Sequence, residues 1–76
     1  MDHPDDSPMR MDVPAEAHSA VGATLTDYER RLGADGYTVR VIRRDGGWLA
    51  VTRDFRPTRV NVAVEGESVV SFEWMG

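Results

Sequence analysis

The first regular pattern of apolar residues lies between residues 24 and 33. Three apolar side chains recur there at helical spacing and would form one stripe: Leu25, Tyr28 and Leu32. Thr26 followed by Glu29 fits a capping box, so a helix is expected to begin at Thr24 or Thr26. Gly33 is a typical residue for a helix end. Because this helix is short, packing rather than intrinsic propensity must stabilise it.

Three later stretches follow the alternation of a β-strand. The first, residues 37–43, alternates until Ile42, which suggests burial of both faces at that end. Residues 60–64 form the second, and residues 65–68 predict a hairpin turn. The third, residues 70–74, would place three large apolar side chains on one face: Val70, Phe72 and Trp74.

The connection between the first two strands, residues 44–59, is too long for a tight hairpin. It leaves room for a parallel crossover or for a wide exposed loop. One helix packed on a small mixed β-sheet is the simplest way to bury the apolar stripe and the strand valines. We therefore predict an α+β fold with a long exposed loop.

Length and composition place these elements in one small domain. The chain has 76 residues and no cysteine, so neither a disulfide framework nor a thiolate metal site can support it. Residues 1–14 hold three of the four prolines and four aspartates without periodicity, which predicts a disordered acidic tail. Residues 15–76 are the predicted domain, in which the alanine-rich residues 15–23 would add at most one frayed helical turn.

The net charge of −4 is unevenly distributed along the chain. Residues 30–59 carry eight arginines against three aspartates, and there is no lysine. An acidic total argues against a nucleic-acid partner, although the basic middle keeps single-stranded nucleic acid on the sheet face as a third alternative. No stretch approaches the ~20 apolar residues of a membrane span, and the first residues lack the apolar run of a signal peptide. We therefore expect no membrane association and a cytoplasmic location, or secretion if the sequence lacks its leader.

The sequence holds no pattern typical of an enzyme. His3 and His18 are far apart and have no ligand spacing to a carboxylate, so we expect no metal site. There is no glycine-rich phosphate loop, nucleophile elbow or catalytic triad. We expect neither catalysis nor a cofactor.

The most distinctive stretch is the polar run that precedes the second strand. Arg53, Arg56 and Arg59 fall within seven residues, with Asp54 beside the first of them. Pro57 fixes φ and has no N–H, so the run is unsuited to a central strand or a helix. It predicts an exposed loop with one stiff position. Taken alone, the three arginines would be solvated charges on a connecting loop.

The whole stretch, Val51-Thr52-Arg53-Asp54-Phe55-Arg56-Pro57-Thr58-Arg59-Val60-Asn61-Val62, resembles the reactive loop and following strand of the potato type I serine protease inhibitors and their bacterial relatives. The family pattern is Val-Thr, a variable residue, an acid, an aromatic, Arg, two variable residues, Arg, an aliphatic, Arg or Asn, and an aliphatic. Every fixed position is satisfied. The predicted order of elements also agrees, so the resemblance covers about residues 24–76.

The resemblance implies an inhibitor that presents a substrate-like loop to a serine endopeptidase. The scissile bond would be Arg53–Asp54, and the residues that meet the protease would be Val51, Thr52, Arg53, Asp54, Phe55 and Arg56. Arg53 would suit the acidic specificity pocket of a trypsin-like enzyme, and subtilisin-like enzymes are the other class of target.

The resemblance also implies which residues hold the loop. Arg59 would reach back to Thr52 and Asp54, while Pro57 would stiffen the side that follows the scissile bond. The family often has a second arginine at the position of Asn61, although the bacterial relatives often carry Asn there. Those relatives also often have a cysteine pair, which this chain lacks.

An alternative is a protein-binding module on the same scaffold that inhibits nothing. The acidic tail could cover the basic loop, or an acidic partner could bind there. In either case we expect the free protein to be a monomer.

Overall fold

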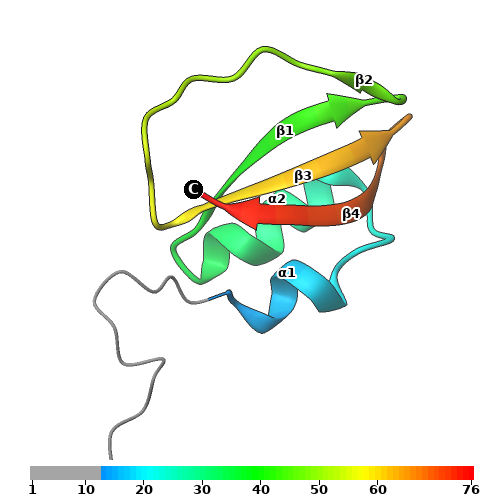
Figure 1. The fold of residues 1–76 in the computed structure, drawn as a ribbon. Helices are drawn as coiled ribbons and strands as arrows, with labels where there is room; N and C mark the ends of the chain where they lie inside the picture. The colour runs from blue at the N-terminus through cyan, green and yellow to red at the C-terminus, as the bar shows by residue number, and fades with distance from the viewer. Residues whose placement is uncertain (1–12) are drawn as a thin grey trace, which may run out of the picture.

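The structure, a computed structural model, describes residues 13–76 and forms two layers. One layer is a four-stranded mixed sheet in the order β2-β1-β3-β4. Two helices cover one face of it, and the connection between β2 and β3 arches over the other side (Figure 1). The predicted α+β fold is therefore confirmed. The predicted tail lies outside the described residues except for Val13 and Pro14.

Helix α2 (Leu25–Ala34) is the predicted amphipathic helix, with Tyr28 and Leu32 buried. Its N-cap is Thr24, whose side-chain oxygen accepts a hydrogen bond from the Asp27 amide. The predicted capping box at Thr26 is wrong, because Thr26 already lies inside the first turn. The predicted end at Gly33 is also wrong by one residue, since the helix includes Ala34 and its C-cap is Asp35.

Helix α1 (Ala15–Ser19) is shorter than two turns but is docked rather than frayed. Ala17 and Ala20 are buried in the core, and small side chains allow this close approach. The buried Tyr28 hydroxyl of α2 donates a 2.7 Å hydrogen bond to the Ala17 carbonyl. A single tyrosine thus joins the two helices and satisfies the carbonyl of the buried Ala17.

The centre of the sheet is a parallel pair of strands, β1 (Thr38–Arg44) and β3 (Arg59–Glu65). The short strand β2 (Gly47–Trp48) turns back antiparallel along β1, and the chain then crosses to the start of β3. The long connection is therefore both a parallel crossover and an exposed loop. Ile42 breaks the alternation of β1 because the register with β3 shifts there, and its side chain is buried.

Strand β4 (Ser68–Met75) pairs antiparallel with β3 but does not alternate as predicted. The register shifts twice, so that Val70 and Glu73 have no partner on β3. Each extra residue turns the next side chain back toward the helices. The core side of β4 is therefore Val69, Phe72 and Met75, while Val70 and Trp74 are exposed. The prediction that Val70, Phe72 and Trp74 share one face is wrong for this reason.

Candidate functional site

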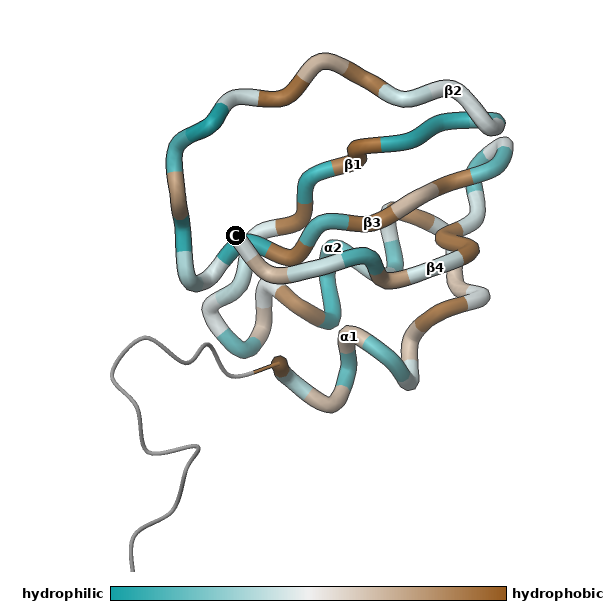
Figure 2. The backbone as a smooth tube through the Cα atoms, in the orientation of Figure 1, coloured by the Kyte–Doolittle hydropathy of each residue, from teal (hydrophilic) through white to brown (hydrophobic). Residues whose placement is uncertain are grey.

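Residues 49–58 form an exposed loop without regular secondary structure, and it ends in a turn at Pro57 and Thr58. Hydrophobic residues flank a hydrophilic stretch at the middle of this loop (Figure 2). All predicted protease-contact residues, Val51 to Arg56, lie within it and are exposed. The loop has no helix or strand to hold it, so its shape depends on side-chain contacts with the sheet below.

Arg59, at the start of β3, holds Asp54 from the side that follows Arg53. Its Nη2 donates to the Asp54 carbonyl at 2.7 Å, and both terminal nitrogens lie 3.4 Å from the Asp54 carboxylate. The same Nη2 donates to the Gly76 carbonyl at 2.7 Å. Arg59 therefore ties the middle of the loop to the end of β4.

The predicted contact between Arg59 and Thr52 is not formed. Thr52 is held instead by Arg40 of β1, whose Nη1 donates to the Thr52 carbonyl at 3.3 Å and to the Thr52 hydroxyl at 3.2 Å. Arg40 was not predicted as a site residue. Its only sequence signal is its place on the polar side of the first strand, which does not reveal that this strand lies beside β3.

Asn61 lies beneath the loop and is fully buried. Its Oδ1 accepts a 2.7 Å hydrogen bond from Arg40 Nε, and its Nδ2 donates to the Trp74 carbonyl at 3.0 Å. Arg40, Asn61 and Trp74 are direct neighbours across three strands in the sheet register. Asn61 thus supports the loop through Arg40 and makes no hydrogen bond to the loop itself.

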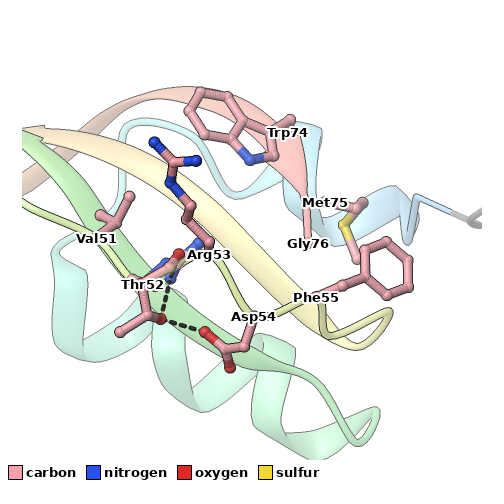
Figure 3. Close-up of a pocket in the computed structure, with 9 residues that line it drawn as sticks. Val51, Thr52, Arg53, Asp54, Phe55, Trp74, Met75 and Gly76 are labelled. Atoms are coloured by element: carbon pink, nitrogen blue, oxygen red, sulfur yellow. Dashed lines mark hydrogen bonds between the residues drawn. The ribbon is translucent and has the colours of Figure 1, made fainter.

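Arg53 lies between the two held residues, and its own side chain is not held. Within residues 13–76 its guanidinium has no hydrogen-bond or ion-pair partner. Figure 3 shows it extending away from the hydrogen bond that the Thr52 hydroxyl donates to Asp54. Phe55 is also exposed, at 63%. The loop therefore presents Arg53 and Phe55 to the outside while it fixes Thr52 and Asp54.

A shallow hollow of about 320 Å³ separates the loop from the end of β4. It is lined by the loop residues from Val51 to Phe55, by Arg40, and by the last three residues, Trp74 to Gly76. Trp74 is 45% exposed at its rim. The hollow is part of the same surface as the loop and is too open to enclose a small ligand.

The charges around Asp54 favour its ionised form. Hydrogen bonds from Thr52, Arg56 and Arg59 hold the pKa of the Asp54 carboxyl well below its ordinary value. Arg56 Nε lies 3.0 Å from this carboxylate but is itself mostly exposed. Asp54 is therefore the acceptor on which the polar contacts of the loop converge.

Burial of the Arg59 side chain costs free energy of folding in this small domain. Only 11% of its side chain is exposed, and its Nε is buried without a partner in the described part of the chain. An unpaired buried donor of this kind costs ~1–3 kcal/mol. A buried arginine kept at that cost, with its terminal nitrogens on the Asp54 and Gly76 carbonyls, points to a role in positioning the loop.

Comparison with protein-family models, with curated proteins and with solved structures finds no match to this chain. Among residues 13–76, no three His, Asp or Glu side chains come together as a possible metal site. No helix in this part of the chain has the length and apolar character needed to cross a membrane.

Proposed function

We propose that this protein inhibits a serine endopeptidase by presenting residues 51–56 as a substrate-like loop. Arg53–Asp54 is the proposed scissile bond, and Arg53 is the residue that enters the specificity pocket of the protease. The observation that carries this proposal is the position of Arg53, whose exposed side chain has no partner within residues 13–76 while the residues on both sides of it are held.

The chemistry of a protease explains why this arrangement suits inhibition. A serine protease attacks a carbonyl that is presented beside its nucleophile and its oxyanion hole. A loop that is already ordered loses less entropy on binding than a flexible peptide does. After cleavage, a held Thr52 and a held Asp54 would keep the two new ends together, so that the bond could reform before either end left the protease.

Arg53 determines the proposed choice of protease. An arginine in the specificity pocket favours enzymes with an acidic residue at the base of that pocket, as in trypsin. Phe55, which is exposed two residues later, would contact a neighbouring subsite. Subtilisin-like proteases, which bind extended substrates over several residues, are the second class to test.

The test is a titration of the full chain against a trypsin-like and a subtilisin-like protease. Wild type should inhibit at least one of them, and mass spectrometry should find slow cleavage only at Arg53–Asp54. Arg53→Ala should weaken inhibition of the trypsin-like enzyme by at least about 30-fold, which corresponds to the ~2 kcal/mol of a binding hot spot. Arg44→Ala, which removes an exposed arginine of β1 outside the loop, is the matched control and should inhibit as wild type does.

Two results would refute the proposal: inhibition of neither class by wild type, or equal inhibition by Arg53→Ala.

A protein-binding module without inhibitory activity is the second candidate. The exposed apolar side chains on and beside the loop favour it: Val51, Phe55 and Trp74. This candidate predicts binding to a protein without competition with protease substrates and without cleavage at Arg53.

A further inference from the structure

We propose that Arg40 is a second positioning residue for the Arg53–Asp54 bond, acting from β1 on the residue before Arg53. This inference rests on the proposed function and assigns a role in it to a strand that is remote in sequence from the loop. Arg40 would hold the chain on the acyl side of the bond, as Arg59 holds it on the leaving side.

The geometry of the guanidinium supports this role. Nε of Arg40 donates to Asn61 Oδ1 at 2.7 Å, while Nη1 reaches both the carbonyl and the hydroxyl of Thr52. The planar fork of arginine fixes the angle between these donors. Once Asn61 fixes the position of Nε, the direction of Nη1 toward Thr52 is largely determined.

Asn61 is suited to fix Arg40 because its own side chain is held in one orientation. It is fully buried, and its Nδ2 is engaged by the Trp74 carbonyl. A flipped amide would aim its NH2 group at Arg40 and its oxygen at a carbonyl, so both contacts would be lost. The amide therefore faces Arg40 with its acceptor, and the sheet holds Arg40 through two successive hydrogen bonds.

Thr52 joins the two arginines. Its hydroxyl accepts from Arg40 and donates to the Asp54 carboxylate, which Arg59 also contacts. Accepting from Arg40 leaves the hydroxyl proton free to point at Asp54. The residues on either side of Arg53 are thus joined to each other and to two neighbouring parallel strands.

This arrangement predicts an effect on cleavage as well as on binding. If Thr52 were released, the acyl end formed by cleavage after Arg53 would move away from the amine of Asp54. Re-formation of the bond would then lose the advantage of holding both ends in place. Without Arg40 the protein should become a better substrate and a weaker inhibitor.

The experiment compares wild type with Arg40→Ala, Arg40→Lys and the control Arg44→Ala, all as full chains. Against the protease that wild type inhibits, Arg40→Ala should raise the inhibition constant about tenfold and speed cleavage at Arg53–Asp54 by a similar factor. Arg40→Lys keeps the charge but lacks the fork, so it should recover only part of the loss. Arg44→Ala should match wild type in both measurements, which excludes a general effect of charge.

A measurement on the free protein separates this inference from the proposed function. Backbone ¹⁵N relaxation should show that Thr52 to Asp54 become more mobile in Arg40→Ala, while residues of the helices do not change. This result would support the role of Arg40 even if wild type inhibited no protease. Unchanged mobility of these residues, or unchanged cleavage by an inhibited protease, would overturn the inference while leaving the proposed function intact.

Discussion

Replacing Arg59 with alanine removes the side chain that, within residues 13–76, bonds directly to both the loop and the Gly76 carbonyl at the end of β4. The bond from Nη2 to the Gly76 carbonyl is partly buried and short, at 2.7 Å, and a hydrogen bond from a charged donor contributes ~1.5–3 kcal/mol. Removal of the unpaired Nε, which costs ~1–3 kcal/mol, offsets much of this, but removal of the mostly buried alkyl part of the side chain adds a loss of similar size. The contacts with the exposed Asp54 carboxylate add little to global stability because solvent screens them.

The expected net loss is therefore about 1–2 kcal/mol in the free energy of unfolding. For a domain of this size, such a loss lowers Tm by roughly 5–15 °C. Thermal unfolding followed by circular dichroism measures this shift. Limited digestion by a trypsin-like protease, with mass spectrometry, measures how much faster the bond after Arg53 is cut when Asp54 is released.

Arg56→Ala is the matched control for this experiment. Arg56 also contacts the Asp54 carboxylate, but its side chain is 66% exposed and only its backbone amide reaches Gly76. Its loss should change stability by no more than ~0.5 kcal/mol. If Arg59→Ala and Arg56→Ala gave the same Tm and the same rate of cleavage, the reasoning that places the link to β4 in Arg59 would be wrong.

Two further predictions concern titratable groups. Burial raises the pKa of Tyr28 to about 12, above the ordinary ~10. The contribution of the protonated Tyr28 to the free energy of unfolding should therefore be complete below pH 10 and be lost as the pH rises from 10 toward 12. Urea unfolding across this range should show the slope, and Tyr28→Phe should flatten it while costing ~1–2 kcal/mol at neutral pH through the unpaired Ala17 carbonyl; an equal slope in both proteins would contradict the assignment. Hydrogen bonds from Thr52, Arg56 and Arg59 lower the pKa of Asp54 in the folded protein. The contacts of Asp54 should therefore be complete above the ordinary pKa of ~3.9 and be lost only as the pH falls through the lower pKa of the folded state. NMR titration of the Asp54 carboxyl carbon measures that midpoint, and a midpoint at or above the ordinary value would refute the network around Thr52.

The patterns that predicted the helix and the central strand were local ones. Tyr28 and Leu32 are buried on one face of α2. Their spacing in the sequence is enough to place them on the same face of a helix. The alternation of β3 also survives, since Val60, Val62 and Val64 all face the helices. These elements could be predicted because period and burial agree over a run that no insertion interrupts.

Strand β4 could not be predicted in the same way. Its core residues Val69, Phe72 and Met75 are three apart, a spacing that does not match the two-residue alternation of a regular strand. Two bulges produce this spacing, and a bulge is a feature of how two strands pair, which the alternation along one strand does not show. Alternation alone therefore assigned Val70 and Trp74 to the wrong face.

The contacts that hold the loop also differ in how far apart their residues lie in the sequence. The residues of the loop and Arg59 are close in sequence, so a short pattern could link them. Arg40 lies 12 residues before Thr52 and reaches it only because β1 and β3 are parallel neighbours. The resemblance assigned the contact with Thr52 to Arg59, and a single sequence does not show that β1 pairs with β3 and so brings Arg40 to Thr52.

The parallel pair also explains why this loop can be held without a helix or a disulfide. A chain that leaves β1 must return along the sheet before it can begin β3, so the connection passes over the strands that it joins. In this protein both helices lie on the opposite face (Figure 1). Outward side chains of β1 and β3 can therefore reach the loop. Arg40 and Arg59 use that position to hold the residues on either side of Arg53. The crossover topology thus supplies both the exposure of Arg53 and the two side chains that hold its neighbours, Thr52 and Asp54.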